Sequence, residues 1–329
     1  YNMANDIEYI LSNMEVPMGY LQEEEEDEIV YDKNNDYKKW EVLPNNTYAP
    51  LGNFKTTKKL IPGKYHLSFD SKSGRYLFIK AEMNLDELFV LPEPSFNSIL
   101  DDIKFFWKNP QKFNEYKYTH KRGILLYGEP GGGKSSLCLL LSNVIIKEEK
   151  GIVIYVDNPD DLDLYMGAME STLRIIEPNT PVLCVIEDLD GLVADKRIES
   201  KLLNLLDGNN QLNNVVYVGC TNYPEDLKDR VLNRPSRFDK RYYIGLPNDE
   251  VREFYLRKKI KSSDLKNIDI SQVVKQTDGL TIAHLGEFIK SVYIFGKDPD
   301  GVVEELKGMG DFISSSRYKS NKPKTGFGR

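Results

Sequence analysis

The sequence predicts an α/β fold: a three-layer domain with a parallel sheet and a phosphate-binding loop, preceded by a small β-rich region and followed by a helical one. Apolar runs of strand length alternate with stretches of helical spacing in the middle of the chain, which is typical of a parallel sheet covered on both faces. A glycine-rich stretch, Gly128–Ser135, joins one such strand to a helical run. From residue 248 onward the apolar residues keep helical spacing alone.

The composition fits two or three globular domains, since the 329 residues are 40 % hydrophobic. The net charge of −7 weighs weakly against a protein that mainly coats nucleic acid, although a local basic groove is compatible with it. No apolar run approaches the roughly 20 residues that span a bilayer, and no signal peptide opens the sequence. The three cysteines lie in apolar runs without metal-ligand spacing, so we expect buried, reduced thiols and a cytoplasmic location.

The two ends of the chain are polar. Residues 1–30 close with the acidic run 23–28, which favours a solvated tail over the alternative of a docking segment for a basic partner. Residues 316–329 are basic, and we expect a flexible tail there rather than a contact with nucleic acid or a partner.

The β-rich region is predicted over residues 31–94. Runs 65–70 and 75–80 alternate apolar and polar side chains on either side of four turn residues, which predicts a β-hairpin. Pro92 and Pro94 then mark a boundary. We therefore expect a small N-terminal β domain.

The α/β domain is predicted over residues 95–247. It opens with a helix, because Phe96, Ile99 and Ile103 follow helical spacing. The helical region 248–315 would form a small lid bundle beside it. Between them, strands separated by helices are predicted at 124–127, 152–156, 182–186, 215–218 and 242–246.

The glycine-rich stretch fits the phosphate-binding pattern G-x-x-x-x-G-K-[ST]. Glycine has no side chain to block the backbone N–H groups, which can therefore turn toward a di- or triphosphate at the positive end of the next helix. Lys134 would reach the β- and γ-phosphates, and the Ser135 hydroxyl would bind Mg²⁺. The alternative is a glycine-rich turn that matches the pattern by chance and binds no phosphate, and the flanking strand and helix disfavour it. The predicted ATP-binding residues of the loop are Gly128, Glu129, Pro130, Gly131, Gly132, Gly133, Lys134, Ser135 and Ser136.

A second part of the site is predicted where strand 182–186 runs into Glu187 and Asp188, with Asp190 close behind. Ionised groups at the end of a buried strand need a cation or hydrogen-bond donors nearby. A phosphate-binding loop needs a carboxylate for Mg²⁺ and a group that orients the attacking water. We expect Glu187 to hold the metal with Ser135 and Asp188 to orient the water, but which of the two carboxylates is the base stays open.

Taken together, the motifs resemble the AAA family of ATPases. The loop, the acidic strand end, Thr221-Asn222 and the segment Arg234–Asp239 occur in the family's order and at similar spacing. Other stretches are similar to the branch that contains the mitochondrial inner-membrane AAA translocase, although its membrane segment is absent from this sequence. These stretches are Arg122–Gly128, Lys134–Leu137 and Leu202–Gly208.

The resemblance implies roles for three further residues. Asn222 would be the polar sensor that helps to hold the attacking water, and Arg234 and Arg237 would be arginine fingers that reach the nucleotide of a neighbouring subunit. A surface salt bridge is the alternative for each arginine. Fingers acting in trans imply a homo-oligomeric ring, and the family's ring implies a hexamer. The order Glu187-Asp188 reverses the Asp-Glu of most members, which places the shorter side chain at the base position.

The resemblance also implies a substrate contact and a site for the adenine. Tyr165-Met166-Gly167 matches the aromatic, hydrophobic, glycine pattern of the family's pore loop, which would grip an extended polypeptide. The alternative is that Tyr165 and Met166 pack on the sheet. The adenine would lie near the segment before the first strand of the domain, where Tyr118 is the first candidate, beside Lys117 and Thr119. The start of the helix at Thr281–His284 would lie close to it on the lid side.

The implied function is a ring-forming ATPase, chaperone-like, that remodels, threads or disassembles a protein substrate. A nucleic-acid motor or clamp-loader-like ATPase is one alternative, which Asp157, Asp160, Asp161 and Asp163 near the predicted pore loop disfavour. A nucleotide-gated scaffold with weak hydrolysis is another, because Asp188 is shorter than the usual Glu. The sequence does not identify the substrate.

Overall fold

The fold is organised around one continuous sheet. The predicted tails at 1–30 and 316–329 lie outside the residues that the structure describes. The computed structural model describes residues 40–43, 45–50, 56–83, 91–207, 212–227, 229–232, 234, 236–265 and 268–313.

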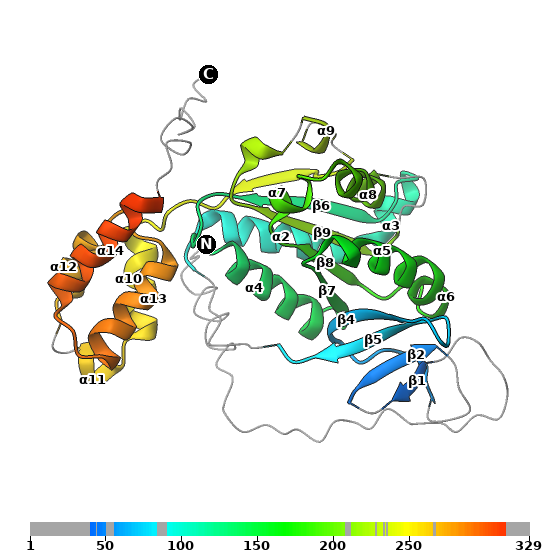
Figure 1. The fold of residues 1–329 in the computed structure, drawn as a ribbon, viewed down its shortest axis with the longest axis horizontal. Helices are drawn as coiled ribbons and strands as arrows, with labels where there is room; N and C mark the ends of the chain where they lie inside the picture. Colours follow the sequence, from blue (N-terminus) through cyan, green and yellow to red (C-terminus); the bar gives the residue numbers. More distant parts are fainter. Residues whose placement is uncertain are drawn as a thin grey trace.

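The centre of the sheet is parallel, in the order β10-β6-β9-β8-β7-β4 (Figure 1). All five strands predicted between 124 and 246 are present. The last of them begins and ends earlier than predicted, although the N–H of Ile244 still donates to the carbonyl oxygen of Tyr127 at 2.8 Å. The bounds are β6 Lys121–Tyr127, β7 Ile152–Val156, β8 Val182–Ile186, β9 Val215–Thr221 and β10 Lys240–Tyr243.

Antiparallel N-terminal strands extend this sheet in the order β4-β5-β2-β1-β3. The predicted hairpin is confirmed as β4 and β5, but it does not belong to a separate domain, because Gly63–Tyr65 of β4 pair in parallel with β7. Trp40, Tyr48 and Phe78 pack in the same core as residues of the central strands. The bounds are β1 Trp40–Leu43, β2 Thr47–Pro50, β3 Thr56–Thr57, β4 Gly63–Asp70 and β5 Arg75–Ala81.

Helices cover both faces of the sheet, which confirms the three-layer α/β fold. Along β8, Val182, Cys184 and Ile186 face the core under α5 and α8, whereas Leu183 and Val185 face the core under α2 and α4. This alternation places the next residue, Glu187, on the α4 face. The helices are α2 Pro94–Lys108, α3 Pro110–Glu115, α4 Lys134–Lys147, α5 Pro159–Ala168, η1 Met169–Leu173, α6 Arg174–Ile176, α7 Leu189–Leu192, α8 Lys196–Asp207, η2 Pro224–Asp226 and α9 Asp229–Leu232.

The C-terminal helices form a bundle with its own core, which Figure 1 shows at one end of the molecule beyond α4. Side chains at N-cap positions fix where three of these helices begin: Asn248, Asp269 and Thr281 each accept a backbone N–H from the first turn. None of the described helices is long and apolar enough to cross a membrane. The bounds are α10 Asp249–Lys259, α11 Ser262–Leu265, α12 Ile270–Gln276, α13 Ile282–Ile289, η3 Lys290–Ile294 and α14 Pro299–Ile313.

Candidate nucleotide site

The glycine-rich loop follows β6 and leads into α4, as the sequence predicts. Gly128, Gly131 and Gly133 have φ angles of 148°, 74° and 108°, a region that side chains rarely allow. At Gly128 space forbids a side chain as well, since a Cβ would lie 2.1 Å from the carbonyl oxygen of Ile244. The loop backbone therefore lies at the N-terminus of α4 without side chains at these glycines to block the approach of an anion.

Lys134 is the first residue of α4, and its side chain is buried under the loop. Its ammonium group donates hydrogen bonds to the carbonyl oxygens of Gly128, at 2.8 Å, and Glu129, at 2.9 Å. Burial lowers the pKa of Lys134, because a desolvated cation is less stable than a hydrated one. The negative charge of a polyphosphate next to this ammonium would stabilise the cation that burial destabilises.

Glu187 lies at the end of β8 on the α4 face, where it meets the exposed residue Ser135. The Ser135 hydroxyl lies near enough to the Glu187 carboxylate to lower the pKa of Glu187 as a hydrogen-bond donor. Burial and the nearby charges of Asp157 and Asp188 raise the pKa of Glu187, against the effect of the Ser135 bond. The structure thus brings together the two residues predicted to bind a metal.

Asp188 turns the chain from β8 into α7 with left-handed backbone angles, φ 45° and ψ 48°. Such angles are uncommon for residues other than glycine and, where the fold enforces them, are found disproportionately at functional sites. The turn leaves Asp188 exposed while Glu187 is half-buried. The two carboxylates therefore point to different surroundings, with Glu187 toward Ser135 and Asp188 toward solvent. This division favours Glu187 as the metal ligand and Asp188 as the group that orients water.

Asn222 follows β9, the strand between β6 and β8, and is half-buried. Thr221, just before it, pairs with Tyr127 at the end of β6 and donates its hydroxyl hydrogen to Asp190. The ends of β6, β8 and β9 are thereby joined at one edge of the sheet. Asn222 lies at the same edge as the loop and the acidic pair, as predicted.

The two predicted arginine fingers both bind Asp207, at the end of α8, within their own chain. Arg237 is buried and donates to Asp207 at 2.8 and 3.4 Å, whereas the side chain of Arg234 is 67 % exposed and donates at 3.0 Å. Although burial opposes it, these bonds lower the pKa of Asp207. The backbone of Arg237 packs on Gly123 near the start of β6, so the arginines lie away from the loop that follows the end of this strand.

Comparison with known families identifies the domain that holds this site. Residues 124–246 match the model of the ATPase family associated with various cellular activities (AAA). The chain carries an AAA domain.

Two curated relatives are similar to the chain over a longer stretch than the AAA domain itself. "Protein SAV" of Sulfolobus acidocaldarius is 27 % identical over 253 residues, 68 % of this chain and 32 % of the relative. The "Putative cell division cycle ATPase" of Plasmodium falciparum is 29 % identical over 194 residues, 54 % of this chain and 15 % of the relative. The chain thus spans less than a third of either relative. Neither name is that of a mitochondrial translocase, so the finer resemblance to that branch stays a prediction.

The predicted adenine contact at Tyr118 is wrong for this AAA domain. Tyr118 lies three residues before β6, whereas the loop follows the other end of this strand of seven residues. A strand of that length separates the two by roughly 20 Å. The exposed Tyr118 side chain therefore cannot contact a nucleotide that the loop of the same chain binds.

The structure brings two segments to the loop, and one of them is the start of the predicted lid helix at Thr281. Phe96 and Leu91 are the nearest side chains to Gly133. The sequence pattern predicted a domain boundary and a helix at these two residues, but no contact with the loop. On the lid side, Ala283 donates its N–H to the carbonyl oxygen of Gly131 at 3.4 Å, and a Cβ on Gly131 would lie 2.8 Å from Thr281 Oγ1. The lid therefore contacts the loop directly through the start of α13. Leu91, Phe96 and the start of α13 are better candidates than Tyr118 for contacts to the nucleoside.

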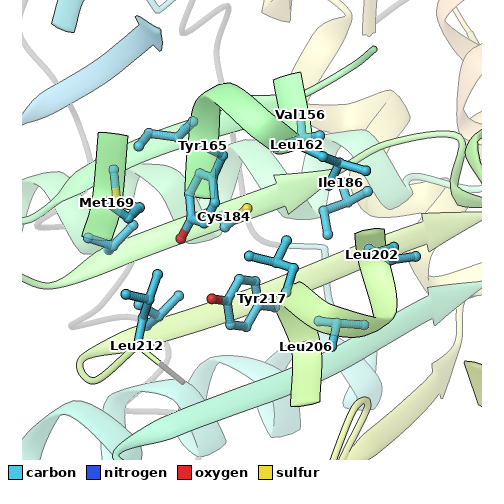
Figure 2. Packing of buried hydrophobic residues seen from close by; sticks show 14 of the residues in the cluster. Val156, Leu162, Tyr165, Met169, Cys184, Ile186, Leu202, Leu206, Leu212 and Tyr217 are labelled. Atoms are coloured by element: carbon cyan, nitrogen blue, oxygen red, sulfur yellow. The ribbon is translucent and has the colours of Figure 1, made fainter. Parts of the chain in front are cut away.

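The predicted pore-loop residue Tyr165 is buried in the core of the AAA domain, with none of its surface exposed. It lies in α5, and its ring is 6.3 Å from the ring of Tyr217 on β9, beside Cys184 (Figure 2). Met166 packs on the same core, and a Cβ on Gly167 would clash with the Tyr76 hydroxyl. The structure therefore agrees with the alternative to a pore loop, namely that Tyr165 and Met166 pack on the sheet. The tripeptide does not present an aromatic side chain to a substrate in this structure.

Proposed function

We propose that the chain binds and hydrolyses ATP in a Mg²⁺-dependent reaction at the composite site around the glycine-rich loop. The observation that carries this proposal is the contact between Ser135, at the start of α4, and Glu187, at the end of β8, beside the buried ammonium of Lys134. A loop that only binds phosphate needs no carboxylate next to its hydroxyl. A site that positions a metal between loop and strand does.

The residues present fit Mg²⁺. The Ser135 hydroxyl and the Glu187 carboxylate are hard oxygen donors that lie near one another, and Mg²⁺ prefers such ligands together with water and phosphate oxygens. Among the described residues no group of three or more His, Cys, Asp or Glu side chains is placed to hold a metal ion, so a metal here would not have an all-protein cage. When bound, the metal would neutralise charge on the β- and γ-phosphates.

The other residues act on the phosphate and on the attacking water. The backbone N–H groups of the loop and the Lys134 ammonium hold the phosphates, which fixes the direction of attack. Asp188 would accept a hydrogen bond from the attacking water and orient it, and Asn222, at the end of the neighbouring strand, would help to hold the same water. The transition state gathers negative charge on the γ-phosphate oxygens, which an added cation would stabilise.

Arg234 is the residue that would supply this cation, from a neighbouring copy of the chain. Its guanidinium is largely exposed, and its segment lies near the start of β6, away from the loop of its own chain. A contact from one copy to the next is heterologous, and such contacts generate a ring where the rotation between copies closes. We propose a closed homo-oligomer of six copies. Arg237, which is buried, would position the segment that carries Arg234.

The work done with ATP would be the remodelling of a protein substrate. The acidic residues at the start of α5 support a protein over a nucleic-acid substrate, because phosphate backbones attract basic surfaces. Burial of Tyr165 means that the contact with substrate lies elsewhere on the ring. Stimulation of ATP hydrolysis by single-stranded DNA, and not by unfolded protein, would favour the nucleic-acid motor instead.

The test is the release of phosphate from ATP by the purified chain, with and without Mg²⁺. We expect turnover that requires Mg²⁺ and is abolished in Lys134→Ala and in Asp188→Asn. The matched control is Lys147→Ala, since Lys147 is the exposed last residue of the same helix. Tight ATP binding without turnover in the unmodified chain would contradict hydrolysis and support the nucleotide-gated scaffold.

A further inference from the structure

Two cysteines, Cys138 and Cys220, lie in contact in the core next to the nucleotide site. The sulfur atoms of Cys138 and Cys220 are 3.3 Å apart, and both residues belong to the core on the α4 face of the sheet. Cys138 lies one helical turn after Lys134, and Cys220 is the residue before Thr221-Asn222. The pair therefore joins the helix that begins at the phosphate-binding loop to the strand that ends at the predicted polar sensor.

The remaining cysteine is a natural reference for this pair. Cys184 lies on β8 but faces the opposite core, beside Tyr165 and Tyr217 (Figure 2). It is fully buried and, like the other two, is a free thiol. Any chemistry that needs two adjacent thiols is therefore available to Cys138 and Cys220 and not to Cys184.

The two paired thiols differ in access. Cys220 keeps 5 % of its surface exposed, whereas Cys138 has none. Cys220 also lies close enough to Lys134 to act on the pKa of that ammonium, which places Cys220 beside the nucleotide site. The hydrogen bond with Cys220 and burial both raise the pKa of Cys138, which keeps the Cys138 thiol protonated until its partner has reacted.

We propose that Cys138 and Cys220 are an oxidation site: a peroxide converts them to a disulfide that inactivates the nucleotide site, and a thiol reductant reverses it. We infer the formation of the disulfide from the sulfur geometry alone, whereas the inactivation rests on the proposed ATPase function. The pair would make ATP turnover depend on the redox state of the surroundings.

The reaction balances with one peroxide. The Cys220 sulfur attacks a peroxide oxygen, so that a sulfur–oxygen bond forms, the oxygen–oxygen bond breaks and the leaving hydroxide takes up the thiol proton as water. The Cys138 sulfur then attacks Cys220, the disulfide bond forms, the sulfur–oxygen bond breaks, and hydroxide leaves with the Cys138 proton as a second water. Two thiols are oxidised while one hydrogen peroxide is reduced to two water molecules.

The disulfide would act on the site through α4. A disulfide holds its sulfur atoms at about 2.0 Å, so closing the gap from 3.3 Å draws α4 and β9 together by roughly 1 Å. A displacement of about 1 Å in a catalytic site can reduce turnover by ~100-fold. Because Lys134 is one turn from Cys138, we expect weaker nucleotide binding as well as slower hydrolysis.

The experiment treats the full chain with hydrogen peroxide and follows three readouts: peptide mapping by mass spectrometry without reduction, binding of a fluorescent ATP analogue, and phosphate release. We expect a Cys138–Cys220 cross-linked peptide and at least a tenfold loss of analogue affinity or turnover, both reversed by dithiothreitol. Cys138→Ala and Cys220→Ala should resist inactivation, whereas Cys184→Ala should remain sensitive. Where an alanine variant unfolds, the serine variant replaces it, and the mapping of the unmodified chain needs no variant.

Each outcome decides a separate point. If peroxide yields other products and no Cys138–Cys220 cross-link, the oxidation site is refuted. A cross-link that leaves analogue binding and turnover unchanged refutes the switch. A chain that forms the cross-link but never hydrolyses ATP, even when reduced, refutes the proposed function and leaves the oxidation site standing, with analogue binding as its remaining readout.

Discussion

The indole nitrogen of Trp40 donates a hydrogen bond to Oε1 of Glu177, 2.8 Å away and 137 positions later in the chain. Leu60 donates its backbone N–H to the same oxygen at 2.7 Å, and the Thr180 hydroxyl donates to Oε2 at 2.7 Å. Trp40 and Glu177 are both buried. This carboxylate therefore holds the N-terminal strands against the segment that precedes β8.

Glu177→Ala should destabilise the fold by about 2–4 kcal/mol, because it leaves the buried N–H groups of Trp40 and Leu60 without an acceptor. Glu177→Gln retains one acceptor and should lose less. The free energy of unfolding in urea measures both, and Glu304→Ala, at an exposed position in α14, is the control. Equal stability of Glu177→Ala and the control would mean that the N-terminal strands are not held by this carboxylate.

Arg234 and Arg237 should respond to alanine in opposite ways. Arg237→Ala removes the buried partner of Asp207 and should cost about 3–5 kcal/mol of stability. Arg234→Ala, at an exposed position, should cost less than about 1 kcal/mol and yet abolish ATP turnover. Urea unfolding and phosphate release separate the two effects. A stable, active Arg234→Ala would show that Arg234 is only a surface ion pair.

Action in trans has a test of its own. An equimolar mixture of Lys134→Ala and Arg234→Ala subunits contains interfaces at which an intact loop meets an intact Arg234, although neither variant alone contains one. We expect the mixture to regain part of the turnover that each variant lacks. Turnover that stays absent, in a mixture shown by mass to co-assemble, would place the action of Arg234 within its own chain.

Local patterns explain what the sequence could predict. The loop, the acidic pair and the five parallel strands each follow from neighbouring residues, through glycine spacing and apolar runs. Pairing of β4 with β7 joins segments almost 90 positions apart, and no local pattern encodes that register. The hairpin of β4 and β5 was therefore predictable, but its place in the central sheet was not.

The sequence contains signals that argue against two of its predictions, the pore loop at Tyr165 and the adenine contact at Tyr118. Asn158 and Asp161 form a capping box around Pro159, a combination that starts a helix, so Tyr165 was predictable as a helical residue facing the sheet. Tyr118 precedes its strand, and phosphate-binding loops follow theirs. The family resemblance also implied that the helix starting at Thr281 lies near the nucleotide, whereas the direct contact of Thr281 with Gly131 depends on how the lid packs.

The ion pair of Asp207 should make stability depend on pH in the acid range. Its pKa is lowered in the folded chain, so the unfolded chain binds the proton more tightly. The stabilisation is fully present above the unfolded value of about 3.9 and is lost as the pH falls through the lowered folded value. The stability difference between the unmodified chain and Asp207→Asn, measured by urea unfolding, should therefore shrink below about pH 4. A difference that stays constant down to pH 2 would contradict the role of these arginines.

Gly131→Ala should separate the lid from the loop. The φ of 74° strains any side chain, and the new Cβ would lie 2.8 Å from Thr281 Oγ1, so the start of α13 must move away. We expect at least tenfold weaker binding of an ATP analogue with little change in helix content. Gly308→Ala, in α14 with open space around it, is the matched control and should be neutral or stabilising by up to about 1 kcal/mol. Unchanged binding in Gly131→Ala would mean that the contact between α13 and the loop is dispensable.

Tyr165→Ala should unfold the AAA domain and not merely uncouple it from a substrate. The side chain is fully buried between α5 and the sheet, next to Tyr217 and Cys184 (Figure 2), and its removal would leave a cavity that costs about 3–5 kcal/mol. Tyr165→Phe keeps the ring and should retain most of the stability and the ATP turnover. Circular dichroism during thermal unfolding detects a loss of folding, and phosphate release shows whether a folded variant still hydrolyses ATP. A Tyr165→Ala chain with normal stability and normal turnover would require Tyr165 to leave the core in the assembled ring and would return it to the role of a substrate contact.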